Sequence, residues 1–245
     1  MRTFATLFKN EMKLNIRNMN MVIFAVILPL VVMAVLRFVS AKDLGNGASR
    51  PTEESFGALC AISMCAGGLM GLPLVLSEYR ERKILKRFRV APVGPALLIA
   101  VELAVFLAYC VVSAITLFLS ARLILKDRPC ASPLSFAGAW VLTAACSLSV
   151  GTVVGGIAGN TKHASVIASV LYFPTMIFSG TTIPTDVLPK AMQNVFNLLP
   201  ITQGIRMMNS AFLGMPIETP WLPVVVTAAV TTVCTGIAIR FFRWE

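Results

Sequence analysis

The sequence predicts an all-α membrane protein with six transmembrane helices, an N-terminal amphipathic interfacial helix and two short outer half-helices before the last span. Two observations predict this class. Apolar residues make up 57% of the 245 residues and charged residues only 13%, about half of their usual ~25% share in a soluble domain. The apolar residues also lie in long uncharged runs, close to the ~20 residues that a helix needs to cross a hydrocarbon core. A barrel would need ~10-residue segments of alternating polarity, which the sequence does not show.

Six apolar runs are predicted to cross the membrane within a single transmembrane domain, residues 1–245. They are Met21–Val39, Phe56–Leu76, Ala96–Ala121, Leu134–Ala158, Ala164–Ile183 and Trp221–Phe242. In lipid, only helices and closed barrels satisfy every backbone polar group, so these runs are predicted to be helices. Pro29, Pro73 and Pro174 fall inside three of them and are expected to kink them, because proline cannot donate the helical hydrogen bond.

Residues 1–19, ahead of the first span, fit an amphipathic helix. At ~100° per residue, four basic side chains fall within an arc of ~80°, and large apolar side chains lie opposite. The basic set is Arg2, Lys9, Lys13 and Arg17, and the apolar set is Phe4, Leu7, Phe8 and Met12. Such a helix favours the membrane interface. A plain basic flank that only orients the first span is the alternative.

The basic residues also predict the orientation of the chain. With six spans, both termini share one side with the loops after the second and fourth spans, and that side carries thirteen of the 21 Lys and Arg. The side richer in Lys and Arg is normally cytoplasmic, so both termini are expected on the inner side of the cytoplasmic membrane. Topology and contact with anionic membrane lipid account for the net charge of +10, and nucleic acid is not an expected partner.

The densest charge run follows the second span, in the loop 78–92. Ile84, Leu85 and Phe88 fall on one face of a short helix with cations around them,. Ala91 and Pro92 then stop that helix. An apolar face with a basic rim suits docking to a soluble partner. The alternative is that the run only adds to the charge bias that orients the spans.

The segment 184–214 is too apolar for an ordinary loop, and its helices are too short to span. One apolar helix face is predicted over Leu188–Leu199 and is stopped by Pro200. A second helix, Ile201–Leu213, is expected to end at Gly214. The pair is expected to lie half-inserted at the outer membrane face, and a surface helix that only packs is the alternative.

Small residues are spaced for close helix contact in the second and fourth spans. Gly67 and Gly71 form one GxxxG pattern, and Gly151, Gly155 and Gly159 form two in series. This pattern lets two helix backbones approach each other. A second copy of the chain is one partner that such faces would suit.

The sequence carries no catalytic or metal-binding motif, so neither a catalytic residue nor a metal ligand is predicted. The six cysteines lack zinc-binding spacing and fit small buried residues,. His163 has no Cys or acidic neighbour, and the common nucleotide and hydrolase motifs are missing,. Glu102 is the one acid inside a span, which makes it a possible intramembrane polar site. It lies about two turns from the cytoplasmic end, so the alternative is that it reaches the interface or pairs there with a basic residue.

Two of these stretches resemble signatures of a known family, the membrane-spanning permease subunits of type-2 ABC exporters. The run from Glu81 to Pro92 is similar to the coupling-helix signature of that family, although Lys83 stands where its members often carry glycine. A second stretch is similar through Ser179, Gly180, Pro184, Leu188, Pro189 and Pro200. The order of amphipathic helix, spans, charged loop and paired helices also resembles the family over nearly the whole chain.

The resemblance implies a transport subunit without an ATPase site, and therefore not an enzyme, with no cofactor bound by this chain. ATP and Mg would bind a separate cytoplasmic ABC ATPase subunit, and a second permease copy, identical or related, would complete the unit. Residues 1–19 would form the elbow helix and residues 78–92 the coupling loop. The residues implied to couple to the ATPase are Glu81, Arg82, Ile84, Leu85, Arg87, Phe88, Arg89 and Pro92.

The predicted function is ATP-driven export of a hydrophobic or amphipathic substrate, such as a drug, a peptide or a lipid-like molecule. The spans are lined by Val, Leu, Ala, Thr and Met, which do not choose among these substrates. An ion-coupled carrier or channel without an ATPase is the alternative, and it would need Glu102 or another charge within a span. A lipid-modifying membrane enzyme is disfavoured, because paired acids or histidines near the interface are missing.

Overall fold

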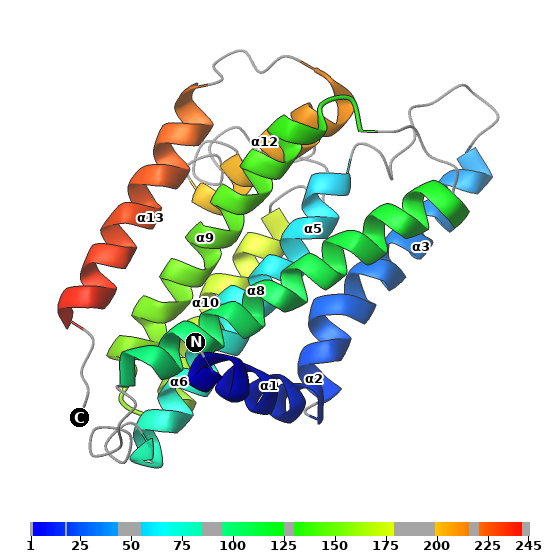
Figure 1. Cartoon of the computed structure of the whole chain (residues 1–245). Coiled ribbons are helices and arrows are strands. Elements are labelled where there is room, and N and C mark those ends of the chain that lie inside the picture. Colours follow the sequence, from blue (N-terminus) through cyan, green and yellow to red (C-terminus); the bar gives the residue numbers. More distant parts are fainter. Residues whose placement is uncertain are drawn as a thin grey trace.

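The computed structural model describes residues 2–17, 19–43, 55–84, 95–124, 130–178, 199–215 and 221–241, and every regular element among them is a helix (Figure 1). The long helices pack side by side as a bundle. The helix α1 (Arg2–Arg17) lies across the lower end of this bundle. The predicted all-α class is therefore confirmed for these residues.

Each predicted span overlaps a helical run of the described residues. The first comprises α2 (Met19–Val22), η1 (Ile23–Ile27) and α3 (Leu28–Asp43), and the second comprises α5 (Phe56–Met64), η3 (Cys65–Gly71) and α6 (Leu72–Glu81). The third comprises α8 (Pro95–Leu119) and η4 (Ser120–Ile124), followed by α9 (Pro133–Ile157), α10 (Thr161–Phe178), the short α12 (Pro200–Leu213) and α13 (Trp221–Phe241). Within the described residues, four helical runs are long and apolar enough to cross a membrane, namely the second and third runs, α9 and α13. The apolar part of the first run, Ile23–Phe38, is shorter, and α10 is not among the four.

Two wide helical turns lie directly ahead of prolines. Both η1 and η3 are π-helical, and Pro29 and Pro73 follow them closely. A proline cannot donate to the carbonyl four residues earlier, which belongs to Ala25 and Leu69 respectively,. Both carbonyls lie inside the π-helical turns, whose wider hydrogen-bond spacing accommodates the missing donor. The kinks predicted at these two prolines therefore fall beside π-helical turns, which are themselves common sites of helix bending.

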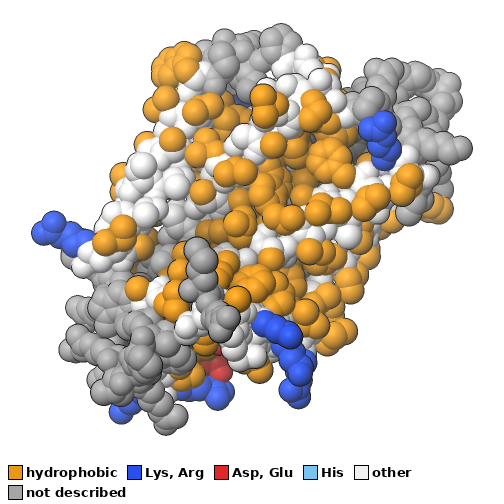
Figure 2. Space-filling model, viewed as in Figure 1, with side chains coloured by type: hydrophobic (Ala, Val, Ile, Leu, Met, Phe, Trp, Pro, Cys, Tyr) orange, Lys and Arg blue, Asp and Glu red, His pale blue; other side chains and the backbone are white. Residues whose placement is uncertain are grey.

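The second span forms the centre of the bundle. In the most apolar stretch of this span 83% of the residues are buried, against 11% in the corresponding stretch of α13. Figure 2 shows hydrophobic side chains over the middle of one face of the molecule, and Lys and Arg towards its ends. This distribution is typical of helices whose middle lies in hydrocarbon and whose ends lie near headgroups.

Glycines bring α9 into close contact with the second span. A Cβ at Gly151 would collide with the carbonyl oxygen of Gly68, and a Cβ at Gly155 would lie 2.8 Å from the Cβ of Leu76. Such an approach requires residues without side chains. At Gly159 a Cβ would make only an ordinary contact. The paired glycines of α9 therefore pack against the second span of the same chain, and not against a second copy.

The short helix α12 packs among α5, α9 and α13. Its C-terminus is closed by Gly214 with φ at 73°, which confirms the predicted end. Phe212 of α12 stacks on Phe56 of α5 with ring centroids 4.4 Å apart, and Phe118 and Phe136 surround this pair. The second predicted half-helix is thus confirmed as a helix, and it is buried. The first one falls on residues 188–198, which lie outside the described part of the chain.

We expect Gly151→Ala to lower the free energy of unfolding by about 1–3 kcal/mol, because the new methyl group overpacks the contact with Gly68. Gly138→Ala in the same helix is the matched control, since nothing lies within 4 Å of a Cβ there. It should raise the free energy of unfolding by about 0.5–1 kcal/mol through loss of a flexible glycine. Thermal unfolding of both variants in one detergent measures the difference, and equal effects would contradict the close contact.

Candidate functional site

Polar side chains gather at the end of the bundle where α1 lies, which we call the α1 end. Here α6 ends, α8 begins, and the turn between α9 and α10 lies against the end of α6 (Figure 1). This end also carries the loop 78–92, of which residues 78–84 are described. Five predicted coupling residues lie outside the described residues: Leu85, Arg87, Phe88, Arg89 and Pro92.

Arg80, in the last turn of α6, binds the end of α9. Its Nη1 donates hydrogen bonds of 2.8 Å to the carbonyl oxygens of Gly156 and Ala158. The last carbonyls of a helix have no partner within it and carry its negative partial charge. A guanidinium group supplies both hydrogen-bond donors and positive charge, so Arg80 closes the C-terminus of α9. From the sequence, Arg80 was only one of many basic residues on its side of the membrane.

Glu81, the next residue, binds the beginning of α10. Its Oε2 accepts a 3.0 Å hydrogen bond from the backbone N–H of Thr161 and a 2.5 Å hydrogen bond from the Thr161 hydroxyl. The first N–H groups of a helix need acceptors and carry positive partial charge. Two neighbouring side chains of opposite charge therefore hold two helix ends of opposite polarity. We call this arrangement the Arg80–Glu81 clasp.

After the clasp, the chain turns sharply at Lys83. The φ of this residue is 55°, in the left-handed region, which costs a residue with a Cβ about 1–2 kcal/mol. This is the position where the resembled family often carries glycine, and the conformation gives the physical reason for that preference. Arg82, another predicted coupling residue, forms an exposed 2.9 Å ion pair with Glu78, and such pairs contribute little to stability.

Ile84, a residue of the predicted docking face, contacts the bundle of its own chain. Its side chain is partly buried and packs against a cluster that includes Leu72, Leu76 and Leu98. Burial of this kind stabilises the chain's own fold. Ile84 therefore anchors the turn after α6 to the bundle, and it cannot serve by itself as a test of docking.

Glu102 of α8 is fully buried, with an exposed fraction of 0%. Its Oε1 lies 2.8 Å from the hydroxyl oxygen of Tyr79 in α6, and the same hydroxyl lies 2.9 Å from Oε2 of Glu11 in α1. Among the described residues, the hydrogen-bond partner of Glu102 is the phenol of Tyr79, which is partly buried, and not a basic residue. Three helices meet at this group, which we call the Glu11–Tyr79–Glu102 cluster.

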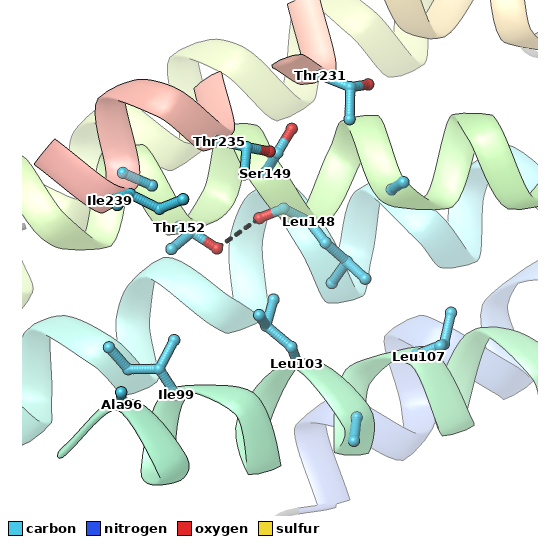
Figure 3. A pocket seen from close by; sticks show the side chains of 13 residues that line it. Ala96, Ile99, Leu103, Leu107, Leu148, Ser149, Thr152, Thr231, Thr235 and Ile239 are labelled. Atoms are coloured by element: carbon cyan, nitrogen blue, oxygen red, sulfur yellow. Dashed lines mark hydrogen bonds between the residues drawn. The ribbon is translucent and has the colours of Figure 1, made fainter. Parts of the chain in front are cut away.

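A groove of about 660 Å³ opens between α8, α9 and α13 (Figure 3). Leu103 and Leu107 of α8, Leu148 of α9 and Ile239 of α13 supply its apolar walls. The hydroxyl of Thr152 also faces the groove, but it donates a 2.7 Å hydrogen bond to the Leu148 carbonyl in its own helix. The groove therefore suits an apolar molecule better than an ion. Sequence reasoning missed it, because its lining residues come from three separate helices.

The remaining candidate residues are potential metal ligands, the cysteines and the predicted outer segment. No three His, Cys, Asp or Glu side chains there are placed to hold a metal ion. Burial raises the pKa of the Cys130 thiol ahead of α9, which disfavours the reactive thiolate. Pro200 begins α12. The remaining predicted outer residues lie outside the described ranges: Ser179, Gly180, Pro184, Leu188 and Pro189.

Comparison with known proteins identifies a family. The family model described as ABC-2 type transporter matches residues 2–213. This match includes α1, the Arg80–Glu81 clasp and Glu102. No curated protein matches the chain.

We expect Lys83→Gly to raise the free energy of unfolding by about 1 kcal/mol, because glycine adopts the left-handed conformation without a steric penalty. The matched control is Lys13→Gly, which places the same change in the middle of α1 at an exposed position. There the substitution should lower stability by about 1 kcal/mol. Thermal unfolding in detergent compares the two variants, and destabilisation by Lys83→Gly would argue against the turn at this residue.

Proposed function

Because the chain belongs to the ABC-2 type transporter family, we propose that it is the permease subunit of an ATP-driven ABC exporter. A separate cytoplasmic ATPase subunit binds ATP and Mg and drives the cycle, and a second permease copy completes the unit. The substrate is a hydrophobic or amphipathic molecule, such as a drug, a peptide or a lipid-like compound. It is moved outward across the cytoplasmic membrane.

The Arg80–Glu81 clasp is the observation that carries this proposal. It ties the start of the loop 78–92 to the end of α9 and to the beginning of α10. Hydrogen bonds that involve charged groups are strong and directional. A partner that moves the loop would therefore move the ends of three helices together. A loop whose only role was to carry positive charge would need no such connection.

The α1 end faces the cytoplasm in this proposal. Lys9, Lys13 and Arg17 are exposed on α1, as expected of side chains that face headgroups and water. On its other face, Phe8 and Met12 pack against a cluster of η1 and α8 residues. This arrangement supports the assignment of residues 1–19 as an elbow helix at the inner membrane interface.

The groove between α8, α9 and α13 supports a hydrophobic or amphipathic substrate. Along α8 it extends from Ala96 to Leu107, which corresponds to about 16 Å of helix. That length is about half of the ~30 Å hydrocarbon core. The groove therefore has room for an apolar chain within the cytoplasmic leaflet.

An ion-coupled carrier without an ATPase is the second candidate, and the burial of Glu102 against Tyr79 and Glu11 favours it. Such a carrier would transport substrate when reconstituted alone in liposomes under an ion gradient. Our proposal expects transport only after the ATPase subunit and ATP are added.

We expect the double variant Leu85→Asp and Phe88→Asp to lose association with the cognate ATPase and its stimulation, because two charges would replace the apolar face that docks. Ile84 is left unchanged, since it is partly buried against the chain's own bundle. Co-purification from membranes and ATP hydrolysis by the complex are the measurements.

Leu134→Asp is the matched control for this pair. Leu134 is 87% exposed at the opposite end of α9, so a carboxylate there should leave association and hydrolysis unchanged. The docking role would be refuted if the double variant bound and stimulated the ATPase as the unmodified chain does.

A further inference from the structure

One phenol hydroxyl lies between two carboxyl groups in the Glu11–Tyr79–Glu102 cluster, at 2.9 Å and 2.8 Å. A tyrosine hydroxyl has a single hydrogen, so it donates to one carboxylate at a time. The second contact is a hydrogen bond only when that carboxyl carries a proton and donates it to the hydroxyl oxygen. Both contacts are therefore hydrogen bonds when one of the two carboxyl groups is protonated and the phenol keeps its own hydrogen.

The burial of Glu102 also favours a bound proton. Glu102 is 0% exposed, and its Oε2 has no hydrogen-bond partner. Tyr109 lies two turns further along the same face of α8, is 6% exposed, and its hydroxyl is also without a partner. Two ionised carboxylates this close would repel each other, and the buried carboxylate of Glu102 could not be solvated. A proton removes one of the two charges.

Among the described residues, the basic side chains near the cluster are exposed or bind other groups, so they do little to offset the charge of its carboxylates. On α1, Lys9 and Lys13 are exposed. On α6, Arg80 donates to the end of α9, and Arg82 pairs with Glu78 in solvent. On α8 and η1, the neighbouring side chains form apolar clusters.

The other titratable groups on the elements packed against α8 lie away from Glu102. Cys60 of α5, Cys65 of η3 and Cys110 of α8 belong to the apolar core cluster that includes Phe56 and Leu59. The later half of α3, which includes Arg37, and η4, which includes Arg122, lie at the end of the bundle away from α1.

We propose that the Glu11–Tyr79–Glu102 cluster is a proton-binding site that holds α1 against α6 and α8 only while the proton is bound. Water reaches the cluster on the side of Glu11, which is partly exposed. A hydronium ion gives up a proton, which is held between the Glu102 carboxyl and the Tyr79 oxygen, and leaves a water molecule, while the phenol itself stays neutral. Loss of the proton to water reverses this step and leaves two carboxylates that repel.

This site makes the docking of α1 depend on pH. The docked state holds one proton more than the released state, in which both carboxylates ionise in water. By linkage, docking is therefore complete on the acid side and weakens as pH rises, by up to about tenfold per pH unit. The inference does not depend on the ATPase or on the substrate, because it concerns this chain alone.

Hydrogen exchange of the α1 amides tests the proposal, with the full chain in lipid nanodiscs and mass spectrometry from about pH 6 to about pH 9, a range that extends well above the usual carboxyl pKa. The unmodified chain is compared with Glu102→Gln at each pH, so that the intrinsic pH dependence of exchange cancels. Gln cannot ionise, so α1 should stay docked throughout the range in this variant. At the acid end of the range, we expect α1 of the unmodified chain to exchange at nearly the same rate as α1 of Glu102→Gln. At the alkaline end, we expect the unmodified chain to exchange at least several-fold faster.

Glu11→Gln is a second variant with the same expected profile, and it keeps the test valid should Glu102→Gln fail to fold. The matched control is Glu78→Gln, which removes the acid beside Tyr79 that is paired in solvent and should follow the unmodified chain. A ratio of exchange rates between the unmodified chain and Glu102→Gln that stays flat across the range would overturn the proposal. So would a change of profile when sodium chloride replaces choline chloride, because a metal cation and not a proton would then occupy the site.

Discussion

The close contact between α9 and the second span determines where the other elements lie. Apolar helices gain little from the hydrophobic effect when they associate in lipid, so close backbone packing must supply the attraction. Gly151 and Gly155 allow α9 to lie directly on η3 and α6. The last carbonyls of α9 then come within reach of Arg80, and the turn that follows brings α10 within reach of Glu81. Larger side chains at these two glycines would move both helix ends away from the end of α6.

Three consecutive residues at the end of α6 hold three different parts of the bundle. Tyr79 contacts α1 and α8, Arg80 caps α9, and Glu81 caps α10. Successive side chains of a helix point about 100° apart, so neighbours in sequence face different partners. The end of α6 is therefore a single rigid junction from which the loop 78–92 departs. Such a junction would pass a movement of the loop on to the helices joined to it, as the proposed function requires.

The polar groups of this junction follow from the cost of burying them. Helix ends expose unpaired N–H and C=O groups, and in a low-dielectric environment these need partners. Arg80 and Glu81 satisfy such groups with charges of the correct sign. The Glu11–Tyr79–Glu102 cluster differs, because it joins two acids and no base. A charge imbalance in a buried site marks a place where a proton can be taken up and released, and here it lies where α1 meets the junction.

Composition and local pattern by themselves determined the helical class, the positions of the long helices among the described residues to within a few residues, the clustering of basic residues and the end of α12 at Gly214. Those features depend on runs of apolar residues, on prolines and on glycines, which act within a few residues of themselves. Only the tertiary structure decided the partners of Glu102, the cap that Arg80 places on α9, the burial of Ile84 and the use of the glycines within one chain. The residues of these contacts are far apart in sequence, 76 positions for Arg80 and Gly156 and 68 for Glu11 and Tyr79. Packing brings them together, and no periodicity in the sequence records it.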